Sequence, residues 1–206
     1  FSFRANSGIW IFLILSGIGI ISGAFSVFGA ETADVVDYRT FFGFDPRTTV
    51  WIIAELHLMF GAFVLGVPMF AVTVEYVGVL TKEERYDRLA KDFTRLLSAS
   101  FALTAALGGL LTFALFTLYP KVMTFMSGIF HESFYIYAFF FFGETFVLYF
   151  YYYSWDRLKN RKGIHISAGV LLNIIGLIIM GISNSWATYM MSPSGIDPET
   201  MKFTGT

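Results

Sequence analysis

The sequence predicts an all-α integral membrane protein, a helical bundle with five transmembrane helices, and three observations support this. Of its 206 residues, 56% are hydrophobic and only 14% are charged, whereas a soluble domain carries about 25% charged residues. The mean hydropathy is +0.65. The apolar residues also gather into five segments, each long enough to supply the roughly 20 residues that a helix needs to cross a bilayer.

The composition also excludes several function classes. The formal net charge of −1 offers no basic surface, so nucleic acid is not an expected partner. The chain has no Cys, which excludes disulfides, Cys-ligated zinc, iron–sulfur clusters and covalently attached c-type haem within it. Hydrolase and nucleotide-binding motifs are absent as well. The 25 Phe and 11 Tyr indicate lipid contact, a large flat cofactor, or both.

The first predicted helix covers residues 8–29. A secretory signal is the competing interpretation, but the apolar run is too long and no A-x-A cleavage site closes it. We therefore expect an anchor helix. With the polar stretch 30–49 after it, this helix forms a first unit, residues 1–49, of anchor helix and outer loop.

Residues 50–191 form the second predicted unit, a four-helix bundle. A charged stretch, residues 81–95, separates its first two helices, Pro120 ends the second, and the charged turn 156–163 separates the last two. Gly108 suits close helix packing. The tail, residues 192–206, is expected to be irregular and to lie outside. The four predicted spans are residues 50–80, 96–118, 131–155 and 164–191.

Basic residues indicate the orientation of the chain, because cytoplasmic loops are enriched in Lys and Arg. Five helices place alternate loops on opposite sides of the membrane. Ten basic residues then share the side of the N-terminus, and four lie on the other side, so we expect the N-terminus inside and the C-terminus outside. The four are Arg39, Arg47, Lys121 and Lys202.

Several ionisable residues lie within predicted spans, where a charge costs roughly 2.5–3.5 kcal/mol to insert and is usually kept for a function. Three of them are candidates for the functional site. His57 is either an axial haem ligand in a Phe-rich bundle or a buried, hydrogen-bonded histidine. Glu144, with Tyr137 on the same helix face, is a proton-relay group, a second axial ligand, or a hydrogen-bonding partner of a neighbouring helix. Glu75 shares a helix face with His57 and either extends to the inner interface or carries protons.

The remaining two histidines lie at predicted helix starts near the interfaces. His131 and His165 are expected to be solvated or to cap their helices rather than to bind a cofactor. The pair His131-Glu132 is too isolated to indicate a metal site.

Two long segments resemble the N-terminal half of cytochrome bd quinol oxidase subunit I. Residues 57–77, HLMFGAFVLGVPMFAVTVEYV, resemble the family's first helix. Residues 143–158, GETFVLYFYYYSWDRL, resemble its stretch of glutamate, aromatic helix and W-D-R-L turn. The resemblance extends over residues 45–203, and the order and spacing of its pieces make it specific. Shorter matches are Arg47, Phe101-Ala102-Leu103, Asn184, Trp186, Pro193 and the run 199–202.

The resemblance implies roles for four residues. The family histidine matching His57 is an axial haem ligand, and the glutamate matching Glu144 lies across the haem on a proton route. An acidic residue also falls at Glu75, implying a second group of the proton pathway. Arg47 would neutralise a haem propionate. The implied cofactor is a non-covalent haem of b or d type, with quinol bound by a partner chain.

The sequence also departs from the family pattern. Thr112 and Ala114 stand where the family has a glutamate and a glutamine, and Ile136 replaces a second glutamate. Residues 8–29 have no counterpart in the family's subunit. The later family helices, with the remaining haem ligands, do not follow residue 206, so we expect a shortened or split relative, or an incomplete chain.

We therefore expect a haem-binding electron-transfer subunit of a quinol-linked respiratory complex, one part of an oxidoreductase and not active alone. One alternative is a genuine terminal-oxidase subunit that reduces oxygen with a partner chain. The other is a haem-free structural or assembly subunit. The expected partners are other membrane subunits, cytochrome c-type subunits on the outer side and the lipid bilayer. The expected location is the prokaryotic inner (cytoplasmic) membrane.

Overall fold

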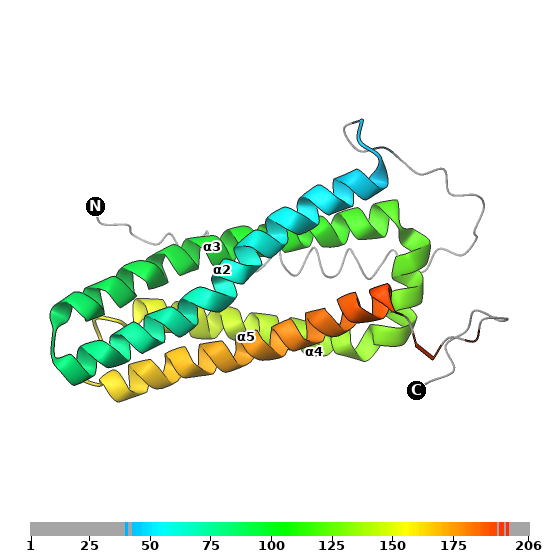
Figure 1. Ribbon diagram of the computed structural model, residues 1–206. Coiled ribbons are helices and arrows are strands. Elements are labelled where there is room, and N and C mark those ends of the chain that lie inside the picture. Colours follow the sequence, from blue (N-terminus) through cyan, green and yellow to red (C-terminus); the bar gives the residue numbers. More distant parts are fainter. Residues whose placement is uncertain (1–39, 41–42, 193, 196, 198–206) are drawn as a thin grey trace.

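Four long helices make up the computed structural model, which describes residues 40, 43–192, 194, 195 and 197. Figure 1 shows the helices running along the molecule as two hairpins. Each is long and apolar enough to cross a membrane, which confirms the predicted all-α architecture for these four. The predicted anchor helix, residues 8–29, lies outside the described residues. The helices are α2 (Pro46–Thr81), α3 (Glu84–Leu118), α4 (Pro120–Tyr153) and α5 (Lys162–Met191).

Local signals in the sequence explain where α2 begins and ends. The Asp45 carboxylate caps it, accepting hydrogen bonds from the Thr48 backbone N–H at 3.1 Å and the Thr48 hydroxyl at 2.6 Å. Pro46 follows at a first-turn position, where no intrahelical N–H bond is lost. Lys82, with a left-handed φ of 59°, ends the helix. Because α3 begins at Glu84, α2 and α3 are necessarily antiparallel neighbours.

Two helix boundaries differ from the sequence prediction. The third span was expected to begin at residue 96, but α3 begins at Glu84, so most of the charged stretch is helical. The fourth span was expected to begin at residue 131, but α4 begins at Pro120 and is irregular at Phe130 (φ −105°, ψ 16°). Proline interrupts a helix interior yet fits a first turn. Pro120 therefore ends one helix and starts the next.

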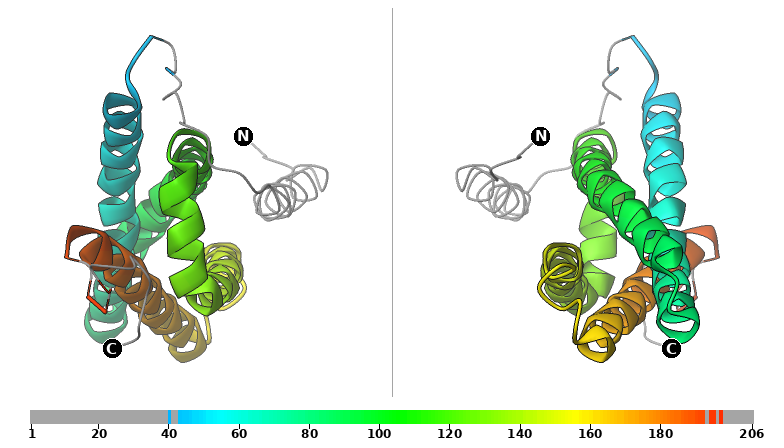
Figure 2. Two further views of the ribbon diagram at one scale, coloured as in Figure 1. Left: turned by 90° about the vertical axis from the view of Figure 1, so that its right-hand side faces the viewer. Right: turned by 90° about the vertical axis from the view of Figure 1, so that its left-hand side faces the viewer.

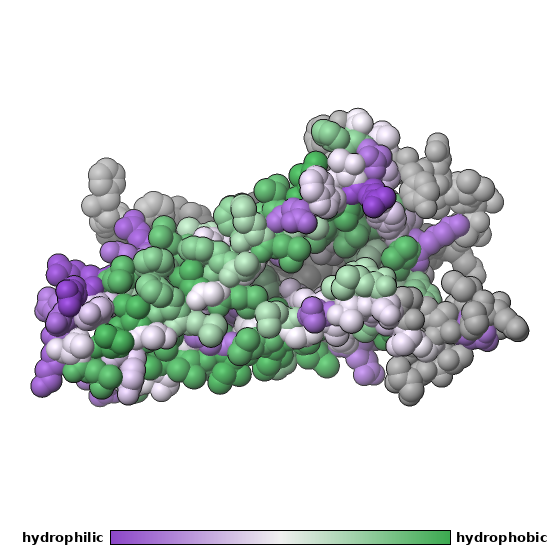
Figure 3. All heavy atoms as spheres, viewed as in Figure 1, coloured by the Kyte–Doolittle hydropathy of each residue, from purple (hydrophilic) through white to green (hydrophobic). Residues whose placement is uncertain are grey.

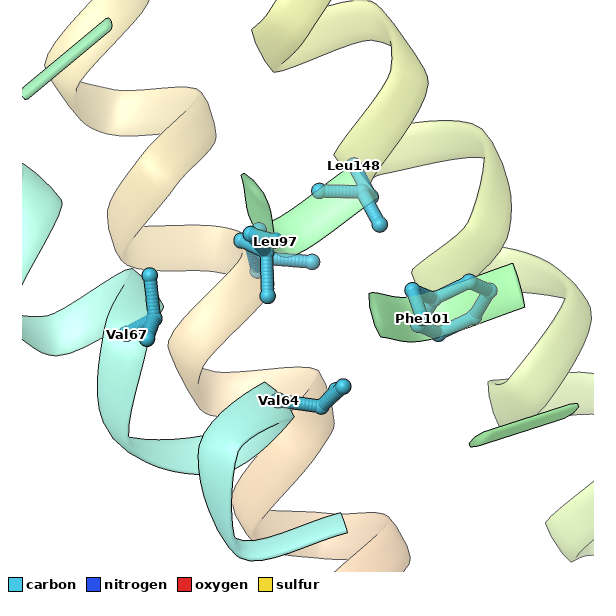
Figure 4. Close-up of a cluster of buried hydrophobic side chains, with 6 residues drawn as sticks. Val64, Val67, Leu97, Phe101 and Leu148 are labelled. Carbon is cyan, nitrogen blue, oxygen red and sulfur yellow. The ribbon is translucent and has the colours of Figure 1, made fainter. Parts of the chain in front are cut away.

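The core of the bundle lies where all four helices approach one another. Its buried residues are Val64, Val67, Leu97, Phe101, Leu148 and Leu172 (Figure 4). A Cβ added at Gly169 of α5 would lie 2.3 Å from Val72 Cγ2 of α2, so only glycine permits this helix crossing. Figure 2, which views the molecule along the bundle, shows the helices arranged around its axis rather than in one layer.

The flanks of the bundle are apolar, and charge gathers at its ends. Phe139 and Phe146 of α4 are 74% and 71% exposed, as expected of side chains that face lipid or another membrane subunit. In Figure 3, hydrophilic residues concentrate where the α2–α3 turn lies. We call this the charged end: the turn at residues 82–83 together with the α4–α5 connection, residues 154–161.

Candidate functional site

The His57 side chain lies between α2 and α3. Its Nδ1 is 3.1 Å from the backbone oxygen of Thr104. A carbonyl oxygen can only accept a hydrogen bond, so Nδ1 must carry the ring proton. The Nε2 atom of the neutral imidazole then keeps its lone pair, which is the form that binds a metal.

The absence of a side chain at Gly108 makes room for this ring. A Cβ added at Gly108 would lie 2.9 Å from Cε1 and 3.3 Å from Nδ1 of His57, so the imidazole lies directly against the α3 backbone. The close packing predicted for Gly108 is therefore present, and it serves the histidine. Sequence reasoning missed this link because Gly108 and His57 are far apart in the chain.

Glu144 lies on α4 and faces α5. Glu144 is only 6% exposed. Its Oε1 is 3.2 Å from the position that a Cβ of Gly176 on α5 would take. Leu65 of α2 approaches the same point to 3.4 Å. Within the described part of the chain, no hydrogen bond satisfies this carboxyl group. Tyr137, two helical turns earlier, lies close enough to interact with it electrostatically.

His57 and Glu144 lie at different heights in the bundle. Leu65, the α2 residue beside Glu144, follows His57 by eight residues, or about 12 Å along the helix. Arg47 lies ten residues before His57, exposed in the first turn of α2. These three predicted site residues are therefore spread along the bundle, and no contact joins them among the described residues.

Glu75 does not extend to the interface but is buried, with 1% of its surface exposed. Its Oε2 accepts a hydrogen bond of 2.8 Å from the Tyr151 hydroxyl. Its Oε1 accepts one of 2.8 Å from Lys162 Nζ. Nδ1 of His165 lies 2.7 Å from Oε1 and 2.9 Å from Oε2. Three polar side chains from α4 and α5 thus surround one carboxyl group of α2.

The sequence prediction for His165, a solvated or capping residue, is wrong. Its side chain is fully buried, and Nε2 lies 2.8 Å from the backbone oxygen of Tyr151. The ring stacks on Tyr151 at 4.4 Å and meets the edge of Trp155 at 4.5 Å between ring centroids. The spacing Lys162–His165 places both on one helix face. This spacing was the one sequence signal available for His165, and it does not reveal that Glu75 of α2 lies opposite the two side chains. His131, in contrast, is exposed as predicted.

Asp87 of α3 completes a group of four ionisable side chains. Lys162 forms an ion pair with Asp87 as well as with Glu75. The indole N–H of Trp155 donates to Asp87 Oδ2 at 3.3 Å. We call Glu75, Asp87, Lys162 and His165 the ion cluster. It lies at the charged end and joins α2, α3 and α5, and through Tyr151 also α4.

The His57 environment fits a haem better than a bare metal ion. In the described ranges, no three His, Asp or Glu side chains lie close enough together to hold a metal ion. A haem iron needs only one or two axial ligands from the protein. The single imidazole of His57, with Nε2 unprotonated and Nδ1 held by Thr104, is the donor that such an iron requires.

These features define a multi-pass membrane helical protein with buried ionisable side chains in its bundle. Residues 46–204 match the family model of cytochrome bd terminal oxidase subunit I, and the chain belongs to this family. The family is prokaryotic, forms part of a respiratory oxidase complex and typically binds haem. The resemblance noted in the sequence is thereby confirmed. A comparison with curated proteins found no match.

Proposed function

We propose that this chain is a haem-binding electron-transfer subunit of a quinol-linked respiratory complex, with His57 as an axial ligand of the iron. The observation that carries the proposal is the hydrogen bond between His57 Nδ1 and the Thr104 carbonyl. Such a bond fixes the tautomer and orientation of a ligating histidine and raises the basicity of its other nitrogen. When bound, the haem supplies one-electron chemistry.

Glu144 is proposed to carry protons rather than to serve as a second axial ligand. Two ligands of one iron would have to reach the same atom, whereas Glu144 lies beside a residue about 12 Å farther along α2 than His57. A buried carboxyl group without a hydrogen-bond partner among the described residues can change its protonation without breaking a network. Glu75 is proposed as a second group of the same proton pathway.

Arg47 is proposed to neutralise a haem propionate. It is exposed in the first turn of α2, the helix that bears His57. A guanidinium group binds carboxylates in a bidentate geometry, which suits this task. The Asp45 cap supports the position of Arg47 because it closes the same turn.

Other subunits complete the proposed site. The apolar flanks of α4 suit contact with membrane helices of a partner chain, which would also bind the quinol. Cytochrome c-type subunits are proposed to dock on the outer side. The chain is accordingly proposed to act only within its complex.

Replacing His57 by alanine in the purified complex tests this function. Reduced-minus-oxidised absorption spectra should lose or strongly shift the bands of one haem, because an axial bond is removed. His131→Ala is the matched control: His131 is exposed and contacts the Tyr135 ring at 5.0 Å, so its loss should leave all bands in place. If His57→Ala leaves every haem band and midpoint potential unchanged, the haem-free structural alternative replaces this proposal.

A further inference from the structure

We infer that the ion cluster is a proton-uptake site, in which His165 and Glu75 share the transferable proton and receive it from the water at the charged end. The inference rests on the proposed function, because the site would supply protons to the pathway that was proposed above for Glu75 and Glu144. His165 is its new member, and Lys162 and Asp87 connect the pair to the aqueous surface.

The hydrogen bonds of His165 show that the pair holds a proton. Nε2 lies 2.8 Å from the Tyr151 carbonyl oxygen, which only accepts, so Nε2 carries a hydrogen. Nδ1 lies 2.7 Å and 2.9 Å from the two oxygens of Glu75. An unprotonated nitrogen would repel an ionised carboxylate at this distance. One proton therefore lies between the two residues, on either Nδ1 or the carboxyl group.

Charge balance indicates why the pair would regain a proton after losing it. With the shared proton counted, the four members of the ion cluster carry no net charge, whichever of the two residues holds the proton. Loss of that proton leaves one net negative charge in a buried site, and an uncompensated buried charge is strongly unfavourable. Among the residues that the structure describes, no further basic side chain forms an ion pair with Glu75 or Asp87. From the surrounding elements, the Tyr151 hydroxyl donates to Glu75 and the Trp155 indole donates to Asp87, and both donors are uncharged.

The cluster extends from the surface to the interior. The side chains of Glu75 and His165 are fully buried, while those of Lys162 and Asp87 are 18% and 29% exposed. The next charged pair, Lys91 with Asp156, is more exposed; its members bind each other and leave Asp87 to the cluster. A proton from water can therefore reach Asp87 first and then the buried pair.

An apolar gap separates the pair from Glu144. Tyr151 follows Glu144 by seven residues, or about 10 Å along α4. Between them lie Leu148 and Leu172, which are 1% and 2% exposed. Transfer across the gap requires a water molecule to take the proton from the pair and release one to Glu144. The pair is then refilled from the charged end, so one proton enters for each that leaves.

A purely structural role accounts less well for this arrangement. Buried ion pairs can often be replaced by apolar residues of similar volume without loss of stability. Ionisable residues within transmembrane segments are also costly to insert, and those that are kept are usually functional. The two roles differ in one measurable effect. Replacing one ionisable member by a neutral residue slows proton uptake if the cluster is a proton-uptake site, and leaves the rate of uptake unchanged if its role is only structural.

The test uses the whole complex in lipid vesicles, with quinol as electron donor and a pH dye on the side of the charged end. His165→Gln and Glu75→Gln should slow proton uptake at least tenfold while the haem bands stay unchanged. His131→Gln, the matched control, should match wild type. Normal uptake in both cluster variants with intact haem bands would overturn the inference.

A second measurement covers the case in which these variants do not assemble. The chain has only three histidines, so a wild-type complex in which this chain alone carries ¹⁵N-histidine gives a resolvable NMR spectrum in bilayers. At pH 7 we expect either a protonated His165 Nδ1 or, with ¹³C-glutamate labelling, a protonated Glu75. An unprotonated Nδ1 together with an ionised Glu75 would overturn the inference. This readout does not depend on haem, so it remains valid if His57 proves not to bind iron.

Discussion

At the residue scale, the position of the His57 ring depends on the absence of a Cβ atom at Gly108. A Cβ at residue 108 would lie 2.9 Å from His57 Cε1, well inside van der Waals contact. Forcing an extra methyl group into a packed site typically costs 1–3 kcal/mol, commonly by displacing a side chain. The imidazole is the group that would have to move, because the α3 backbone on the other side is held in a helix.

Gly108→Ala should therefore shift the His57-linked haem without removing the protein from the membrane. We expect a changed midpoint potential or band position in a spectroelectrochemical titration of the complex. Gly66→Ala is the matched control, since a Cβ there meets no atom within 4 Å. An identical titration for Gly108→Ala and wild type would mean that the histidine does not depend on this contact.

Glu144 permits a second test at the same scale. Glu144→Gln keeps the size of the side chain and removes its ionisable proton, and no hydrogen bond within the described residues is lost. Quinol-driven turnover should fall at least tenfold, while the haem spectrum should stay as in wild type. A changed spectrum would instead support the second-ligand role, and unchanged turnover would exclude Glu144 from proton transfer.

At the element scale, the sequence predicted where the four helices lie more reliably than where they begin. The hydropathy pattern located all four, because an apolar run marks the membrane-spanning part of a helix. It did not locate the start of α3 at Glu84, since charged residues that precede a span can form the first turns of the same helix in water. Pro120 was used only as a stop signal, so the first turns of α4 were missed.

The start of α2 provides a prediction at this scale. Asp45→Ala removes both hydrogen bonds to Thr48, so the first turn, including Arg47, should open more often. Hydrogen–deuterium exchange of the amides of residues 47–50 should become faster, and exchange in the middle of α2 should not. Asp45→Asn, which retains an acceptor for the Thr48 amide, is the control.

The same cap should depend on pH. Hydrogen bonds from Thr48 hold the pKa of Asp45 below its usual value of 3.8. A lowered carboxyl pKa stabilises the folded turn above the unfolded pKa, and this contribution is lost as the pH falls through the folded value. Wild type should thus approach the exchange of Asp45→Ala only below about pH 4. Equal exchange rates at pH 7 would show that the cap does not hold the turn.

At the scale of the whole molecule, the sequence could assign residues to helix faces but not pair them across the bundle. Helical periodicity predicted that Glu75 shares a face of its helix with His57, but not which residues that face meets. The contact between Glu75 and His165 joins residues 90 positions apart, and it depends on how α2 and α5 cross at Gly169. No local pattern encodes that crossing. The family match supports the haem proposal for His57, whereas the ion cluster emerged only from the assembled helices.

The orientation of the whole molecule in the membrane decides which compartment supplies the protons. Of the 14 basic residues, ten are predicted to share the side of the charged end, which the positive-inside rule assigns to the cytoplasm. The chain has no Cys, so single cysteines can be introduced without background. A thiol at Ser194 should react with a membrane-impermeant reagent from outside, and one at Lys159 only after the membrane is opened; both positions are exposed. The reverse pattern would place the ion cluster on the outer side, and proton uptake by His165 and Glu75 would then have to occur from that side.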